Sequence, residues 1–226
     1  MSDEAVADRA VDDMGQVARR GFVLILSSPS GAGKTSLTKA LKADKETNLE
    51  VSVSVTTRAK RKNEIDGQDY EFIAVEDFQH LRDHDDLLEW AEVHGNYYGT
   101  PRRPVEKHLA AGTDMIFDID YQGTRQVREK LGQDVVTVFI MPPSMPELRS
   151  RLERRAQDST ETIERRLKNA QVEIARWEEY DYVIVNDDLD KSLTGLRGIL
   201  DAERLKRERQ TGLPAFVTTL LREPAG

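Results

Sequence analysis

The sequence predicts an α/β fold in which helices cover both faces of a mainly parallel sheet. Short apolar segments alternate along the chain with longer segments whose apolar residues recur at helical spacing. This alternation is typical of parallel strands joined by crossover helices. Two stretches, 53–103 and 145–166, depart from it, the first with several strands in succession and the second with many arginines. We therefore expect a three-layer core with one inserted subdomain and a second, smaller helical insertion.

The first apolar segment, residues 22–26, leads directly into a loop rich in serine and glycine. The loop and the start of the next helix read Ser-Pro-Ser-Gly-Ala-Gly-Lys-Thr over residues 28–35. The pattern of a phosphate-binding P-loop requires this context, a buried strand before the loop and a helix after it. Ser28 stands where that pattern has its first glycine. The strand and the Gly-Lys-Thr ending favour a P-loop over an ordinary turn.

Each residue type in this loop suits a nucleoside triphosphate. Gly31 and Gly33 allow the backbone to turn its N–H groups inward around an anion. Lys34 offers a positive charge to the β- and γ-phosphates, and the Thr35 hydroxyl can bind Mg²⁺. The helix that begins near Lys34 adds the positive end of its dipole.

Composition excludes several other classes of function. The 226 residues carry a net charge of −8, which argues against a general nucleic-acid or acidic-membrane surface. The chain has no cysteine, so disulfides, thiol catalysis and zinc–thiolate sites are excluded. No apolar run is long enough to cross a membrane, and residues 1–20 are too acidic for a signal peptide. We expect a flexible leader over 1–20 and a cytoplasmic location.

The next part of the chain predicts the inserted subdomain. Residues 51–55 alternate as a half-buried strand and end in the basic turn 56–62, which is either a solvated charge run or an anion site. A strand over 70–73, a helix over 76–82 and a strand over 87–93 follow. Glu89 lies within the last of these, and a buried carboxylate there needs partners unless it faces water.

The chain then returns to alternating helices and strands. We expect helices over 101–111, 121–130, 144–156, 163–177 and 189–207, and strands over 115–120, 135–140 and 183–185. Asp118 and Asp120 end one strand, where ligands bind in a parallel sheet, although capping of the next helix is an alternative. Ser144 and Glu147 form a capping box. The polar residues 157–160 predict a turn, and the tail from 212 has apolar residues that could dock on the body.

Several motifs together resemble a guanylate kinase over residues 21–205. They occur in family order at 30–35, 52–58, 66–70, 89–91, 95–100, 118–123 and 183–188. The resemblance implies a P-loop NTPase-type three-layer fold and Mg²⁺-dependent transfer of the γ-phosphoryl group of ATP to GMP. It divides the chain into a core (21–52, 104–144 and 167–205), a GMP-binding subdomain (53–103), a lid (145–166) and a C-terminal extension (206–226).

The resemblance also implies roles for individual residues. Those expected to bind ATP are Ser30, Gly31, Ala32, Gly33, Lys34, Thr35, Ser36, Arg151 and Asn186. Those expected to bind GMP are Ser54, Arg58, Arg61, Tyr70, Glu89, Tyr98, Thr100 and Asp120. The groups expected to act on the transferring phosphoryl are Lys34, Arg58, Arg155 and Arg166. Thr35 and Asp118 are expected to bind or organise Mg²⁺. Glu89 would accept from guanine N1–H and the N2 amino group, with Ser54 and Thr100 at O6.

Two alternatives remain at this point. A guanylate-kinase-like module in a scaffold protein binds peptides without catalysis, and a related kinase acts on another nucleoside monophosphate. The intact P-loop and Arg155 favour an enzyme, and Glu89 with Ser54 and Thr100 favours GMP. The expected partners are ATP and GMP, with no nucleic acid and no membrane, and the chain could be a monomer or a homo-oligomer.

Overall fold

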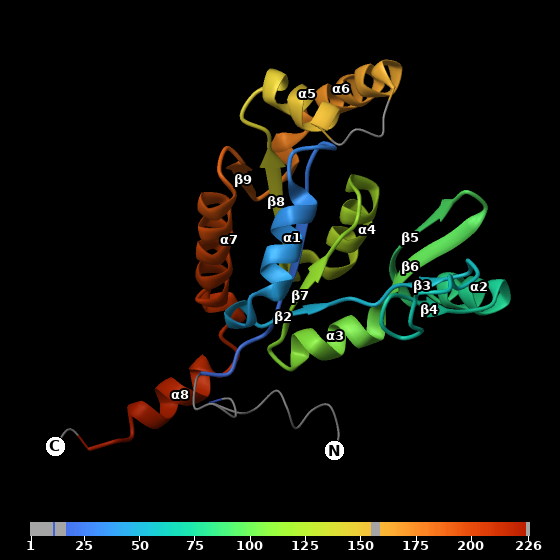
Figure 1. The fold of residues 1–226 in the computed structure, drawn as a ribbon. Coiled ribbons are helices and arrows are strands. Elements are labelled where there is room, and N and C mark those ends of the chain that lie inside the picture. The colour runs from blue at the N-terminus through green and yellow to red at the C-terminus, as the bar shows by residue number, and fades with distance from the viewer. Residues whose placement is uncertain (1–10, 12–16, 155–158, 225–226) are drawn as a thin grey trace.

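The computed structural model describes residues 11, 17–154 and 159–224, and it places the core around a parallel sheet (Figure 1). Five strands pair in parallel in the order β2-β7-β1-β8-β9. Their bounds are Leu49–Val51 (β2), Asp114–Phe117 (β7), Val23–Ser27 (β1), Val135–Met141 (β8) and Tyr182–Val185 (β9). The expected α/β fold with a mainly parallel sheet is confirmed.

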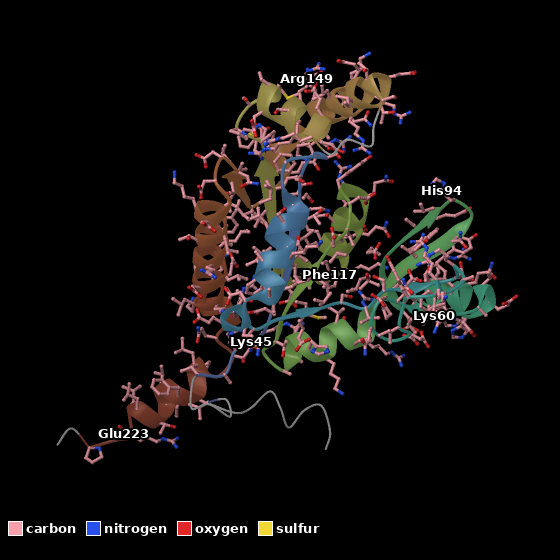
Figure 2. The ribbon with its side chains drawn as sticks, in the orientation of Figure 1. Lys45, Lys60, His94, Phe117, Arg149 and Glu223 are labelled. Atoms are coloured by element: carbon pink, nitrogen blue, oxygen red, sulfur yellow. The ribbon has the colours of Figure 1, made fainter. Side chains whose placement is uncertain are left out.

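Helices cover both faces of this sheet, because its central strands bury side chains on both sides. Leu24 of β1 packs with α1 (Lys34–Ala43) and α7 (Leu189–Arg204), whereas its neighbour Val23 packs with α3 (Arg102–Ala110) and α4 (Tyr121–Leu131). Phe117 lies in the middle of the molecule (Figure 2). The result is two apolar layers, one on each side of β1.

A second, mixed sheet lies beside the core. Its strand order is β4-β3-β6-β5, with bounds Glu71–Phe72 (β4), Val55–Thr56 (β3), Asn96–Pro101 (β6) and Leu87–Val93 (β5). Helix α2 (Val75–Asp83) covers it, and the Phe78 ring stacks on Tyr97 with their centroids 5.2 Å apart. The sheet lies to one side of the core layers, in contact with α4 through β5, and its loops carry Lys60 and His94 away from Phe117 (Figure 2).

Two further helices lie over the carboxyl ends of the central strands (Figure 1). These are α5 (Met145–Arg154) and α6 (Thr160–Ile174), which bury Leu148, Leu152 and Leu167 against each other. The Ser144 hydroxyl accepts a hydrogen bond from the Glu147 backbone N–H at 3.2 Å, as the capping box predicts. Of the polar turn expected at 157–160, residues 157 and 158 lie outside the described residues, whereas Ser159 caps α6 and Thr160 begins it.

The C-terminal tail forms a helix that extends from the body. Helix α8 (Leu213–Leu220) buries none of its residues, and it is attached at its base, where Gly212 N–H donates to the Ala18 carbonyl at 2.8 Å. Short 3₁₀ turns complete the fold at Lys45–Thr47, Gly132–Asp134, Trp177–Glu179 and Arg207–Arg209. None of the described helices is long and apolar enough to cross a membrane.

The structure corrects two expectations about strands. Residues 51–55 do not form one strand, because Val51 ends β2 in the central sheet and Val55 begins β3 in the second sheet. The strand expected at 115–120 ends at Phe117, so Asp118 and Asp120 lie in the loop that follows it. Strand β6 (Asn96–Pro101) was not expected from its sequence.

A buried ionic cluster joins residues near the beginning and the end of the core sequence. We expect its central carboxylate to be critical for stability. Asp114 is fully buried at the start of β7 and accepts hydrogen bonds from Arg19, at 2.7 and 2.9 Å, and from Arg204, at 2.8 Å. Asp114→Ala leaves two guanidinium groups without their anion and should lower the free energy of unfolding by about 3–5 kcal/mol. Urea unfolding measures this effect.

The matched control is Asp201→Ala. Asp201 also forms an ion pair with Arg204, but it is exposed and the two groups are 3.7 Å apart. An exposed pair contributes about 0–1 kcal/mol, so this variant should unfold close to the parent protein. Equal unfolding midpoints for the two variants would contradict the importance of Asp114.

Candidate active site

The predicted phosphate loop has the backbone geometry that its glycines allow. It connects the end of β1 to Lys34, the first residue of α1, and Gly31 and Gly33 have φ angles of +95° and +104°. Residues that have a side chain rarely adopt this left-handed backbone region. At Gly33 there is also no room for one, because a Cβ would lie 2.2 Å from Asn186 Nδ2. Both glycines are therefore required by conformation, and Gly33 also by close approach.

The Asn186 side chain holds the backbone of this loop. Its Nδ2 donates to the Ala32 carbonyl at 2.7 Å, and its Oδ1 accepts from the Ser192 hydroxyl at 3.0 Å. Arg151 of α5 donates to the Asn186 carbonyl at 3.1 Å. The Asn186 side chain is 5% exposed, and these bonds favour a role in shaping the loop. Asn186 and Arg151 line one surface cavity with Gly31, Gly33 and Ser36.

Lys34 and Asp118 meet at the carboxyl end of the central sheet. Lys34 Nζ lies 2.6 Å from Asp118 Oδ1, and the side chain of Asp118 is 54% exposed. Thr35 follows Lys34 and is exposed, as is Ser30 in the loop. The Thr35 hydroxyl and the Asp118 carboxylate are hard oxygen donors next to a phosphate loop, which is the chemistry that Mg²⁺ prefers. No group of three or more acidic, His or Cys ligands occurs among the described residues.

The basic turn after β3 forms a cluster with two tyrosines. Arg58 lies 5.6 Å from the centre of the Tyr70 ring, and the Tyr70 and Tyr98 rings are 5.9 Å apart. Arg58 Nη1 and Nη2 donate to the two oxygens of the Glu64 carboxylate, at 3.1 and 2.8 Å. The Arg61 backbone N–H donates to the same carboxylate at 2.8 Å, while the Arg61 residue is exposed.

These contacts change the ionisation of the pair. The hydrogen bond to Glu64 raises the pKa of Arg58, with a further contribution from Tyr98, and the Arg58 hydrogen bond lowers the pKa of Glu64. Glu64 therefore occupies the guanidinium fork as an anion. Glu64 was not predicted as a site residue, because its only signal in the sequence is an acidic residue shortly after the basic run 56–62.

Glu89 is buried in the second sheet and has a polar partner. Its side chain is 8% exposed, and its Oε1 accepts a hydrogen bond from the Thr100 hydroxyl at 2.6 Å. Ser54 Oγ lies 3.5 Å from Thr100 Oγ1. Burial raises the pKa of the Glu89 carboxyl, the Thr100 bond opposes that shift, and the charge of Asp120 adds to it. Glu89 thus does not face water.

Asp120 caps α4 next to Glu89. Its Oδ1 accepts from the backbone N–H groups of Gln122 and Gly123, both at 2.9 Å. Asp120 therefore caps the helix, and its charge also acts on Glu89, so capping is not its only contact with the site. Asp120 lines an open cavity with Lys34, Tyr121, Glu173 and Arg176, at the centre of the carboxyl edge of the sheet.

The three lid arginines are only partly described. Arg151 belongs to α5 and contacts the loop through the Ala32 and Asn186 carbonyls. Arg166 is half-buried in the middle of α6. Arg155 lies outside the described residues. The structure thus brings Arg151 to the phosphate loop.

Comparison with known proteins identifies relatives along most of the chain. A family model described as guanylate kinase matches residues 20–203. The guanylate kinase of Agrobacterium fabrum is 55% identical over 92% of this chain and 94% of its own length. That of Mesorhizobium japonicum is 56% identical over 93% and 97%. The crystal structure of guanylate kinase from Anaplasma phagocytophilum is 40% identical and matches with a TM-score of 0.66, over 91% of this chain and 97% of that one.

Proposed function

The chain belongs to the guanylate kinase family, and we propose that its phosphate loop binds ATP while its second sheet binds GMP. It is an ATP:GMP phosphotransferase, which releases ADP and GDP. The observation that carries the substrate assignment is the buried Glu89 carboxylate, which has one oxygen bonded to the Thr100 hydroxyl.

Glu89 is the residue that selects guanine. A carboxylate accepts the two neighbouring donors of guanine, N1–H and the N2 amino group. The Ser54 hydroxyl can donate to O6, whereas the Thr100 hydroxyl can do so only by turning from Glu89, to which it donates here. Adenine lacks that pair of donors and would leave the buried carboxylate with Thr100 but without its partners on the base. An unsatisfied buried polar group costs about 1–3 kcal/mol, and a charged one costs more. This penalty is the physical basis of the base preference.

The phosphate of GMP is bound by Arg58, Arg61, Tyr70 and Tyr98. The bidentate contact between Arg58 and Glu64 supports this assignment, because the guanidinium fork that holds a carboxylate also fits two oxygens of a phosphate. GMP must therefore share or displace Glu64 at this position. Because the phosphate is already ionised, the acceptor oxygen needs no strong general base.

The donor side relies on Lys34 and the loop backbone. Lys34 neutralises the β- and γ-phosphate oxygens, which requires its ammonium to leave Asp118. Loop residues Ser30, Gly31, Ala32, Gly33, Thr35 and Ser36, together with Arg151 and Asn186, form or support the ATP site. Thr35 and Asp118 would hold Mg²⁺, which supplies positive charge to the phosphates. Positioning and charge neutralisation account for most of the catalysis in such transfers.

We further propose that the subdomain 53–103 and the lid 145–166 close over the core segments 21–52, 104–144 and 167–205. Closure would bring Arg155 and Arg166 to the transferring group and exclude water, which otherwise competes as acceptor. Small-angle X-ray scattering should show a smaller radius of gyration with a bisubstrate analogue that joins the two nucleotides. An unchanged radius would contradict closure.

The protein is placed in the cytoplasm, with its two nucleotides as its partners and without a nucleic-acid partner. The net charge of −8 argues against a nucleic-acid surface, and the absence of cysteine is compatible with a reducing cytosol. Subcellular fractionation with an antibody against the chain checks the location.

A coupled assay with ATP and each of GMP, AMP, UMP and CMP tests the function. We expect rapid turnover with GMP and little with the others. A faster rate with AMP or UMP would refute the role of Glu89 in base selection. Absence of phosphorylation of every acceptor would instead favour a peptide-binding module.

A further inference from the structure

Glu89 lies at an irregularity in the edge strand of the second sheet. On β5, Leu87 pairs with Pro101 of β6, whereas Glu89 pairs with the adjacent Thr100, so Leu88 is an extra residue without a partner. Such a bulge re-aims the side chains around it. Here it lets Leu87 pack in the core of the second sheet while Leu88 packs in the central core. The direction of the Glu89 carboxylate therefore depends on this bulge being maintained.

Helix α4 holds the outer edge of β5 on both sides of Glu89. Gln126 Oε1 accepts from the Trp90 backbone N–H, and Gln126 Nε2 donates to the Trp90 carbonyl, both at 3.1 Å. This pair of bonds is the one that a neighbouring strand would make. One turn further along α4, Lys130 Nζ donates to the Leu87 carbonyl at 2.5 Å. The edge strand is thus paired by side chains of a helix.

The same face of α4 also touches the carboxylate. A Cβ built on Gly123 would lie 3.3 Å from Glu89 Oε2, so the carboxylate oxygen approaches the helix closely. Gly123 lies three residues before Gln126, and positions three apart share one helix face. Contacts from this single face thus reach both the backbone of β5 and the Glu89 side chain.

We propose that Gln126 is a positioning residue for guanine recognition. By pairing with both peptide groups of Trp90, it holds β5 in the bulged register that aims Glu89 at the base. This inference rests on the proposed role of Glu89. Without the amide, the peptide groups beside Glu89 lose their partners and the strand is free to shift, and a small displacement is enough to weaken a paired hydrogen-bond contact.

The test compares Gln126→Leu with Gln133→Leu, which makes the same change at an exposed position beyond the end of α4. The acceptors are GMP and IMP, because IMP keeps N1–H and O6 and lacks the N2 amino group. For Gln126→Leu we expect KM for GMP to rise about tenfold and KM for ATP to change by less than about twofold. The preference for GMP over IMP in kcat/KM should fall by about threefold or more.

A merely structural role would lower kcat/KM for GMP and IMP equally, or raise KM for ATP in step with that for GMP. Either result would overturn the proposal. If Gln126→Leu does not fold, Gln126→Glu replaces it, since this variant keeps the acceptor for Trp90 N–H and loses the donor to the Trp90 carbonyl. Its preference for GMP should also fall, and an unchanged preference would overturn the proposal.

Glu89→Gln separates this inference from the proposed function. If Glu89→Gln leaves the preference for GMP over IMP intact, the role of Glu89 is wrong and the role of Gln126 falls with it. If Glu89→Gln removes the preference and Gln126→Leu keeps it, only the positioning role of Gln126 is wrong. Hydrogen–deuterium exchange of the peptide that contains β5 supplies a second readout, with faster exchange expected in Gln126→Leu.

Discussion

Replacing Lys34 by alanine is expected to lower kcat by about 10²–10³-fold while the protein stays folded. The loss follows from removing a fixed positive charge at the place where negative charge on the transferring phosphoryl must be neutralised, and a single preorganised donor contributes on this order. The pair of Lys34 with Asp118 is partly exposed, with side chains 25% and 54% accessible. Such a pair contributes about 0–1 kcal/mol, so the unfolding midpoint should move little.

Lys39→Ala is the matched control, because Lys39 is an exposed residue of the same helix. It removes the same charge from α1 at a position away from the phosphate loop. Steady-state kinetics with saturating ATP and GMP, together with urea unfolding of both variants, give the comparison. A kcat for Lys34→Ala close to that for Lys39→Ala would refute the catalytic role of Lys34.

The phosphate loop could be predicted from the sequence because its chemistry is local. The apolar strand, the two glycines and Lys34 are contiguous, and each of them is required by the conformation of a few neighbouring residues. The structure places Gly31 and Gly33 at positive φ and begins α1 at Lys34, as that pattern predicts. The motif does not include Asn186, which donates a hydrogen bond to the Ala32 carbonyl and lies 154 residues further along the chain.

The errors in strand prediction arose where the outcome depends on which sheet a segment joins and not on its local sequence pattern. Residues 51–55 alternate as a strand should, but alternation does not say which sheet a strand joins. Here Val51 and Val55 join different sheets, so the chain crosses between them. Gln126 has no sequence signature either, because a glutamine on a helix becomes a strand partner only through the packing of α4 on β5.

The basic turn and Glu89 show what the structure adds to a resemblance. The turn could have been a solvated charge run, yet the side chain of Arg58 is only 15% exposed and is held by Glu64. Glu89 could have faced water, yet it is buried beside Thr100. Periodicity left the side of Glu89 open, since a two-residue period is satisfied by either face of β5 when a bulge lies within the strand.

Glu89→Gln is expected to lower kcat/KM for GMP by about 10²-fold and to leave KM for ATP nearly unchanged. Gln keeps an oxygen that can accept from Thr100, and it places an NH₂ group where the second carboxylate oxygen lies. That donor then faces one of the two guanine donors, so one hydrogen bond is lost and two donor groups oppose each other in a buried site. Initial rates at varied GMP and fixed ATP measure the effect. Glu92→Gln, at an exposed position of the same strand, is the control.

The same substitution should stabilise the protein, and the sign follows from the ionisation of Glu89. Burial raises the pKa of Glu89 in the folded state above its unfolded value. The folded protein therefore binds this proton more tightly, and the associated stability is present at acid pH and is lost as the pH rises through the raised pKa. Glu89→Gln should consequently unfold at higher urea than the parent at pH 7, with a smaller difference near pH 4.

The same raised pKa predicts the pH dependence of GMP use. Guanine binds the carboxylate form, so kcat/KM for GMP should fall on acidification at a higher pH than the ordinary pKa of a glutamate would give. This acid limb of the pH profile should be absent in Glu89→Gln, because glutamine does not titrate. A parent enzyme and a Glu89→Gln variant with the same acid limb would assign the titration to another group. The buried carboxylate thus lowers stability at neutral pH and confers base selection, and both effects have the same physical cause.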